Sequence, residues 1–297
     1  MRPPVDATRG QLVRLRITQH WPIVALSFVP LLIFRRALLF GETLFYQDLA
    51  AQYFPREQLL MRTGATGWNP HIFLGMSLVG DPQTAAHEPV RALARLLGLE
   101  ASTGLVFMLA VYLIVAGLGV YLFALRKGAA PIGAAGAVLA AIWGGLYVVR
   151  FRHPPLLTSM CMIPWTALVS ELLLAEGTLL WALVLALIIA VGALGGGPQG
   201  PYMLWLFVAS YLGLGVWVGV PVGQRLSRLW SLAWRLAIGA VAFLGLIAIQ
   251  YLPVGMMIPQ TARHEAGVAF VGAYSLSPSS WAHLVVPDLY GNDMNQT

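Results

Sequence analysis

The sequence predicts an all-α integral membrane protein of about seven transmembrane helices, with a long first outer loop that carries interfacial helices. Of its 297 residues, 58% are hydrophobic and only 10% are charged, and so few charges cannot cover a water-exposed surface. Several apolar runs reach or approach the roughly 20 residues that cross a bilayer. Short clusters rich in glycine, proline and arginine separate these runs. We therefore expect a single transmembrane domain over residues 1–297, with the lipid bilayer as its main partner.

The composition also excludes several other classes of protein. The net charge is +6, but the arginines stand at the ends of apolar runs and form no basic stripe, so no nucleic-acid partner is expected. The single cysteine, Cys161, lies in an apolar run, which excludes an internal disulfide framework and a cysteine-based metal site. The basic N-terminus superficially resembles a secretory signal, but no small-residue cleavage site follows, so we expect an uncleaved first span.

The spans follow from the apolar runs in chain order. The first run is short and carries Arg35 and Arg36 near its far end, which must reach the interface or face protein. A glycine-rich segment from Gly195 to Pro201 predicts a tight turn between the fifth and sixth spans. The seven expected spans are 21–40, 103–125, 131–149, 156–174, 178–194, 202–220, and a last one that follows Arg235 and ends near Ile258.

The distribution of Lys and Arg in short loops predicts the orientation. Arginines of the N-terminus, Arg126 with Lys127, and the group from Arg225 to Arg235 would share one side of the membrane. Because that side is normally cytoplasmic, residues 1–20 are expected to be cytoplasmic. The long loop 41–103 and the polar tail 259–297 would then both lie outside the cytoplasmic (inner) membrane.

The long loop contains the first candidate for chemistry, Asp48. Leu49 and Tyr53 share one helical face, and Asp48 and Gln52 share another, which predicts a short interfacial helix that ends where Pro55 begins a second one. A carboxylate near the outer surface can act as a base, bind a metal or pair with an arginine. From spacing alone, the commoner role of aspartate as a helix N-cap is favoured.

Further along the loop, acidic and histidine side chains offer ligands for a divalent metal ion. Asp81 precedes a proline and marks a turn, His87 and Glu88 follow it, and His71 precedes it. No recognised metal-binding spacing is present. Asp48, Asp81, His87 and Glu88 are therefore only candidate ligands. Residues 89–100 predict an amphipathic interfacial helix whose arginines meet lipid phosphate.

Polar groups near the later spans have simpler expected roles. Arg263 either anchors the end of the last span or clamps a phosphate, to which a guanidinium donates a planar fork of hydrogen bonds. Glu171 and Glu176 are expected at the interface with no particular partner. Gln250, inside the last span, needs a hydrogen-bond partner within the helix bundle.

The order of motifs resembles that of the YfhO-like bacterial membrane proteins, a family grouped with the GT-C glycosyltransferases. Each motif is weak alone, but the set covers nearly the whole chain and keeps its placement relative to the spans. The matching segments are Asp48 with Gln52 to Pro55, Trp68-Asn69-Pro70, Phe73 to Met76, Asp81-Pro82-Gln83, Gly196 to Gln199, Gln250 with Pro253, Thr261-Ala262-Arg263, Ser277-Pro278 and Pro287 to Gly291.

The resemblance implies sugar transfer from a polyprenyl-phosphate donor to a cell-envelope or lipid acceptor, on the outer face of the cytoplasmic membrane. In that class an acidic residue of the first outer loop is the base or a metal ligand, which here is Asp48. Family members continue beyond the Pro287 to Gly291 segment, so the tail is expected to be truncated relative to them. The family pattern does not identify the cation that stabilises the leaving phosphate, and we expect Arg263 to have that role. The expected substrate-binding residues are Gln52, Trp68, Asn69, Asp81, Gln83 and Arg263.

Two other functions fit the sequence. A non-catalytic membrane scaffold or accessory subunit would use the long loop to dock a partner. A transporter would carry charged residues or paired glycine and proline breaks deep within its spans. Because the charges lie mainly at span ends, transport ranks last.

Overall fold

The computed structural model describes residues 20–44, 48–64, 67–72, 74–261, 267, 272, 275 and 278–286. The chain forms two compact units, Met1–Val254 and Gly255–Thr297. In the second unit the described elements are the end of helix α12 and two 3-10 helices, Ile258–Gln260 and Pro278–Leu284. Apart from the last residues of α12 and the 3-10 helix that follows it, all further structure described below belongs to the first unit.

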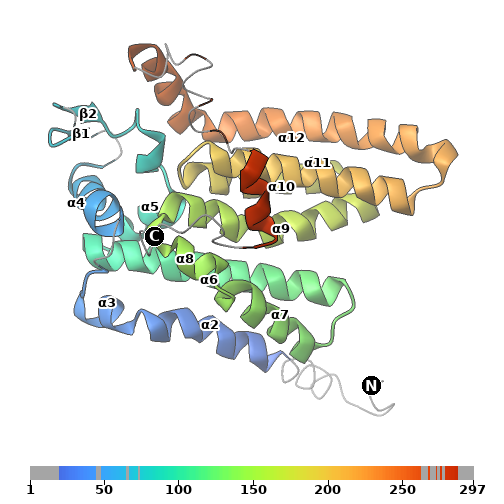
Figure 1. Cartoon of the computed structure of the whole chain (residues 1–297), viewed down its shortest axis with the longest axis horizontal. Helices are drawn as coiled ribbons and strands as arrows, with labels where there is room; N and C mark the ends of the chain where they lie inside the picture. Colours follow the sequence, from blue (N-terminus) through green and yellow to red (C-terminus); the bar gives the residue numbers. More distant parts are fainter. Residues whose placement is uncertain are drawn as a thin grey trace. The chain divides into compact units, whose positions relative to one another are not determined.

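The first unit is a helix bundle (Figure 1). Among the described residues, five segments are long and apolar enough to cross a membrane, which confirms the helical class and fits a multi-pass membrane protein. They are Ala101–Arg126, Pro131–Arg152, Pro154–Glu176, Gln199–Gly219 and Val222–Gln260. Two shorter apolar helices, α2 (Trp21–Ile33) and α10 (Leu179–Leu194), match the other two predicted spans in place but not in length.

Several of these segments consist of more than one element. The expected first span is α2 followed by α3 (Arg35–Phe40), because the helix is interrupted at Phe34. The segment from Pro131 contains α7 (Pro131–Trp143), α8 (Leu146–Val149) and a 3-10 turn (Arg150–Arg152). The remaining bundle helices are α6 (Ala101–Arg126), α9 (Pro154–Glu176), α11 (Gln199–Gly219) and α12 (Val222–Met257).

Helices α6 and α9 form the centre of the bundle. In each, 61% of the most apolar window is buried, against 22% in α11 and in α12. Helix α6 packs against α2, α7 and α9, and α9 packs against α10 and α11. The outer helices expose many large apolar side chains, such as Leu226 and Val241 of α12. An apolar exterior of this kind suits lipid as the surrounding solvent.

Several polar side chains of the bundle helices have backbone or side-chain partners. Ser159 Oγ donates to the Gly192 carbonyl at 2.9 Å, and Trp165 Nε1 donates to the Val115 carbonyl at 2.7 Å. Glu171, for which no partner was expected, accepts a hydrogen bond from Tyr211 at 2.7 Å and forms an ion pair with Lys127 at 2.7 Å. Such pairing is needed because an unsatisfied polar group in an apolar interior is costly.

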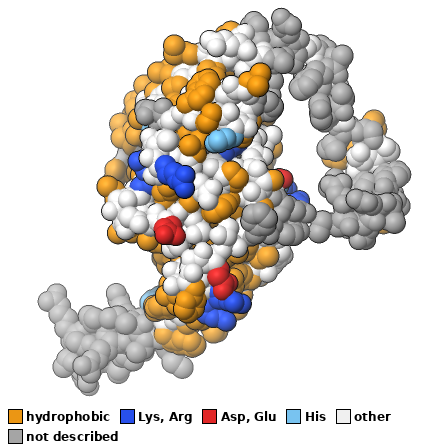
Figure 2. Space-filling view, turned by 90° about the vertical axis from the view of Figure 1, so that its left-hand side faces the viewer, with side chains coloured by type: hydrophobic (Ala, Val, Ile, Leu, Met, Phe, Trp, Pro, Cys, Tyr) orange, Lys and Arg blue, Asp and Glu red, His pale blue; other side chains and the backbone are white. Residues whose placement is uncertain are grey.

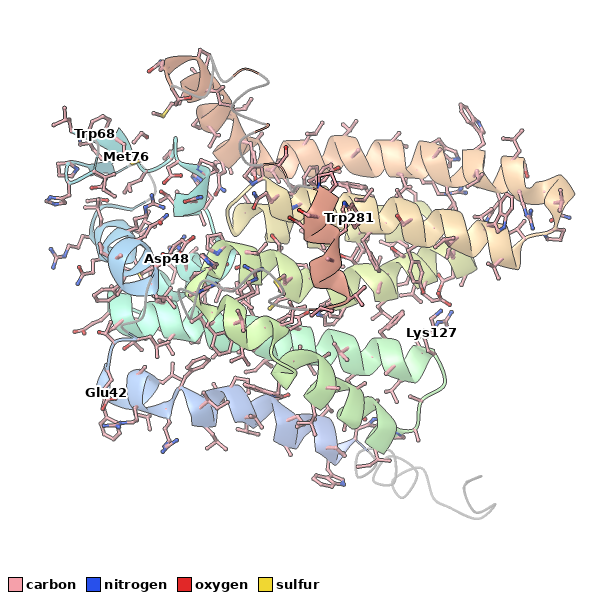
Figure 3. All side chains as sticks on the ribbon, viewed as in Figure 1. Glu42, Asp48, Trp68, Met76, Lys127 and Trp281 are labelled. Atoms are coloured by element: carbon pink, nitrogen blue, oxygen red, sulfur yellow. The ribbon has the colours of Figure 1, made fainter. Side chains whose placement is uncertain are left out.

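The segment 41–100 lies at one end of the bundle, called the loop end below. Asp48, Trp68 and Met76 are at this end, and Lys127 is at the opposite end (Figure 3). The second helix begins where Pro55 predicts it, but the helix changes type without breaking: a π-helix, Leu49–Tyr53, continues directly into α4 (Phe54–Thr63). The remaining elements are the antiparallel strands β1 (Trp68–Asn69) and β2 (Met76–Ser77), a 3-10 turn (Pro82–Thr84) and α5 (Pro89–Leu96).

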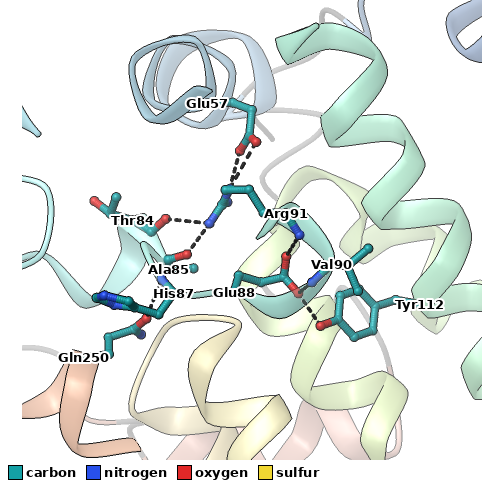
Figure 4. Close-up of polar contacts among 9 residues, drawn as sticks. All are labelled: Glu57, Thr84, Ala85, His87, Glu88, Val90, Arg91, Tyr112 and Gln250. Atoms are coloured by element: carbon teal, nitrogen blue, oxygen red, sulfur yellow. Dashed lines mark hydrogen bonds and ion pairs between the residues drawn. The ribbon is translucent and has the colours of Figure 1, made fainter. Parts of the chain in front are cut away.

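Helix α5 forms within the segment 89–100, which the sequence predicts to be an amphipathic helix, but it corrects the role of Arg91. Leu93 and Leu96 are exposed, whereas the Arg91 side chain is only 8% exposed. Arg91 Nε donates to both carboxylate oxygens of Glu57, at 2.8 and 3.1 Å, and its guanidinium also donates to the carbonyl oxygens of Thr84 and Ala85 (Figure 4). Arg91 therefore holds protein groups together and does not meet lipid phosphate.

Glu88 connects this network to the bundle. Its carboxylate caps α5 by accepting from the backbone N–H groups of Val90 and Arg91, and it also accepts from the Tyr112 hydroxyl of α6. Burial raises the pKa of Glu57, and the Arg91 guanidinium opposes that shift. Arg91 thus opposes protonation of the buried Glu57 carboxylate and fixes its position.

Replacing Arg91 with methionine is expected to lower the free energy of unfolding by about 3–5 kcal/mol, because it leaves Glu57 buried and unpaired. Unfolding in detergent micelles measures the change. Arg95→Met is the matched control, since Arg95 lies on the same helix but is exposed, and should cost less than about 0.5 kcal/mol. Adding Glu57→Gln to Arg91→Met should restore part of the lost free energy of unfolding. Equal losses in the Arg91→Met and Arg95→Met variants would contradict the assignment.

Candidate functional site

Polar side chains from four separate parts of the chain meet in a pocket at the loop end. The pocket has a volume of about 220 Å³. It is formed by the π-helix, the 3-10 turn at residue 82, the start of α9 and the turn between α10 and α11. Charged side chains on this end of the molecule stand in small separate groups (Figure 2). The lining residues are Tyr53, Gln83, Arg150, His153, Pro155, Leu156, Gly196, Gly197, Gln199 and Gly200.

The predicted glycine-rich turn forms one wall of this pocket. Gly196 and Gly197 have φ values of +97° and +80°, which residues with a side chain rarely adopt. A Cβ atom on Gly196 would lie 2.7 Å from the Pro82 carbonyl oxygen. Glycine is therefore required here, both for the turn and for its close contact with the segment after Asp81.

Asp48 lies beside His153 at this pocket. Its Oδ2 is 3.4 Å from His153 Nδ1, and the Asp48 side chain is half exposed. Asp48 precedes the π-helix, but its carboxylate makes no capping hydrogen bond. The structure therefore does not support the N-cap interpretation favoured by spacing, and it gives the carboxylate a histidine partner.

The surroundings of His153 favour its neutral form. Partial burial lowers the pKa of His153, the Asp48 carboxylate opposes the shift, and the positive charges of Arg152 and Arg150 lower the pKa further. Tyr53 packs edge-on against the imidazole, with ring centroids 6.4 Å apart, and burial raises the pKa of its own hydroxyl. A neutral imidazole beside a carboxylate can accept a proton from a bound hydroxyl group.

Two of the expected substrate-binding residues, Gln52 and Gln83, contact each other beside this pocket, which Gln83 lines. Gln52 Nε2 donates to Gln83 Oε1 at 2.8 Å. Asp81, by contrast, has a structural role, because it accepts from Gln83 N at 3.0 Å and pairs with Arg56 at 2.9 Å. Its side chain is only 12% exposed.

Trp68 and Asn69, two other expected substrate-binding residues, do not line the pocket. Trp68 and Asn69 belong to the β1–β2 hairpin, and neither is among the described residues that line the pocket. Asn69 is buried and accepts from the His71 backbone N–H at 3.0 Å, so its side chain stabilises the turn of the hairpin. Arg263 lies outside the described residues.

The four candidate metal ligands have separate surroundings. Within the ranges that the structure describes, no group of three or more His, Cys, Asp or Glu side chains is placed to hold a metal ion. Glu88 caps α5, and the backbone N–H of His87 donates to Gln250 Oε1 at 3.3 Å. Gln250, expected to bond within the bundle, thus bonds to the 41–100 segment.

Sequence reasoning missed Arg150, His153 and Gln199 as members of this site. Arg150 and His153 were assigned only to the connection between the third and fourth spans. With alternating spans, that connection must lie on the same side as the long loop. The same topological argument brings the turn containing Gln199 to that side, so the signal was present in the order of the spans.

Comparison with protein-family models, curated proteins and solved structures finds no match for this chain.

The charge of His153 should make stability depend on pH. Its pKa is lowered from the usual 6.5 in the folded state, so the unfolded chain binds the proton more tightly, and stability falls as pH drops below about 6.5. A His153→Asn variant should lose less stability over that range. NMR titration of the imidazole provides the direct measurement: Asp48→Asn should lower the pKa further, and Arg150→Gln should raise it. Shifts in the reverse directions would contradict the assignment.

Proposed function

We propose that the protein is a GT-C type membrane glycosyltransferase of the cytoplasmic membrane. It would transfer a sugar from a polyprenyl-phosphate donor to a cell-envelope or lipid acceptor on the outer face. The observation that carries the proposal is the pocket at the loop end, where the Asp48–His153 pair and Arg150 meet. The resemblance of the motif order to YfhO-like proteins supports the same activity.

The reaction needs a base and a fixed cation, and the pocket offers both. The acceptor hydroxyl oxygen forms the new bond to the anomeric carbon, and its proton passes to the neutral His153 imidazole, which Asp48 orients. The bond between the anomeric carbon and the phosphate oxygen breaks, and its electron pair leaves with the lipid phosphate. The Arg150 guanidinium stabilises that negative charge. Asp48 acts either as this orienting group or, if a divalent ion is required, as its ligand.

The position of the pocket suits a lipid-linked donor. His153 lies directly between two segments that are long and apolar enough to cross a membrane, Pro131–Arg152 and Pro154–Glu176. A residue at such a junction is near the headgroup level of the bilayer. A polyprenyl chain can therefore stay in the hydrocarbon while its phosphate reaches Arg150.

The proposed topology has seven spans and a cytoplasmic N-terminus. Helices α2 and α3 together cover Trp21 to Phe40, or about 30 Å at 1.5 Å per residue, which matches the hydrocarbon thickness. Helix α10, with 16 residues, is about 24 Å long. One side of α10 is buried against α9 and α11, so it does not have to match the bilayer alone.

The test is consumption of a polyprenyl-phosphate sugar by membranes that contain each variant. His153→Gln and Asp48→Asn should each lower the rate by roughly 10²–10⁴-fold, because they remove or misorient the base. Arg150→Gln should lower the rate by about 10²-fold through lost stabilisation of the leaving phosphate. Glu42→Gln is the matched control and should leave the rate unchanged, since Glu42 is an exposed carboxylate of the same segment paired with Arg36.

The outcome separates the enzyme from an accessory subunit. If the wild-type protein consumes no donor, and the Asp48→Asn variant supports the cell-envelope phenotype as well as the wild type, the proposal is wrong. The protein would then act as a scaffold. Loss of activity on addition of a chelator, restored by a divalent ion, would assign Asp48 as a metal ligand.

A further inference from the structure

A second, larger cavity opens at the loop end, between α3, α4 and the start of α6. Its volume is about 540 Å³, within the roughly 300–1,000 Å³ typical of small-molecule sites. Phe54 lines this groove, whereas its neighbour Tyr53 lines the pocket beside His153. The groove is therefore a separate site, and the proposed sugar transfer does not use it.

Two opposite charges face this groove without pairing. Arg62, in the last turn of α4, and Glu100, directly before α6, both line it. Neither side chain forms an ion pair with any residue in the described part of the chain. Exposed opposite charges that line one cavity but stay apart fit a ligand that carries both charges itself.

The negative part of such a ligand has a suitable place at the start of α6. Ala101 and Ser102, the first residues of this 26-residue helix, line the groove. The first intrahelical hydrogen bond is donated by Gly104, so the preceding N–H groups are free of intrahelical partners. Ser102 is only 7% exposed, and its hydroxyl has no hydrogen-bond partner among the described residues. Helix N–H groups, a free hydroxyl and a guanidinium together favour phosphate.

The surroundings of the groove favour a lipid over a soluble ligand. Gly41, at one wall, directly follows Leu39 and Phe40 of α3, whose side chains are 74% and 76% exposed. The opposite wall is the N-terminal end of α6, a helix that is long and apolar enough to cross a membrane. A ligand in the groove thus sits at headgroup depth, with apolar side chains beside it for acyl chains.

We infer that this groove binds the headgroup of an ethanolamine phospholipid. The phosphate accepts hydrogen bonds from Arg62, Ser102 and the α6 N-terminus, and the primary ammonium donates to the Glu100 carboxylate. A choline headgroup has the same charges but no N–H donor for Glu100. A glycerol headgroup leaves the whole lipid negative, and Glu100 opposes it.

The experiment measures retention of short-chain phosphatidylethanolamine, phosphatidylcholine and phosphatidylglycerol by the purified protein, using native mass spectrometry. Wild type should prefer phosphatidylethanolamine. Arg62→Gln should weaken binding of all three lipids by roughly tenfold, the effect of losing one charge-assisted contact. Glu100→Gln should make phosphatidylethanolamine and phosphatidylcholine bind equally. Arg95→Gln, which removes an exposed arginine of the neighbouring α5 that does not line the groove, is the control.

Three results would overturn the inference. Equal binding of all three lipids to wild type would mean ordinary contact with surrounding lipid. Preference for phosphatidylglycerol would mean an anion site in which Glu100 takes no part. Equal effects of Arg62→Gln and Arg95→Gln would mean that the groove is not the site. Glycosyl transfer by Arg62→Gln and Glu100→Gln should be unchanged when donor and acceptor are saturating, which separates this inference from the proposed function.

Discussion

The arrangement of the loop end depends on a buried arginine. Arg91 joins α5 to Glu57 of α4 and to the backbone after Asp81, while Glu88, one turn away, bonds to Tyr112 of α6. An ion pair this deeply buried has a large desolvation cost, which is offset by two Arg91–Glu57 hydrogen bonds and by the bonds from Arg91 to the Thr84 and Ala85 carbonyl oxygens. The network fixes three elements of the 41–100 segment to the bundle. Both cavities at this end are built against those elements.

The two cavities differ in ways that follow from their walls. One wall of the pocket beside His153 is a glycine turn. Gly196 of this turn lies so close to the Pro82 carbonyl oxygen that a side chain at position 196 would clash with it. Two of the pocket's lining residues are paired with neighbouring polar side chains, Gln83 with Gln52 and His153 with Asp48. The groove beside Glu100 is wider, and its charged groups stay apart. Paired groups suit chemistry on a positioned substrate, whereas separated charges suit recognition of a zwitterion.

The roles predicted from sequence differ from the observed ones where a side chain could bond to several alternative partners. The N-cap role is common for aspartate, yet Asp48 meets His153 and Asp81 provides the cap of the 3-10 turn. Arginines of an amphipathic helix usually meet lipid, yet Arg91 points inward while leucines of the same helix point out. In each case local spacing permits several partners, and the partner present comes from a distant segment.

Residue order alone was enough to predict the helical, membrane-type architecture, the start of a second helix at Pro55 and the glycine turn between α10 and α11. These features follow from apolar run length and from backbone restrictions of proline and glycine, which act locally. The three-dimensional packing was needed to show that Asp48 lies beside His153, that Arg150 lines the same pocket as His153, that Gln250 reaches the His87 backbone, and that Arg62 and Glu100 face one groove. These contacts join residues far apart in the sequence, and they depend on how the helix ends pack together, which local sequence does not encode.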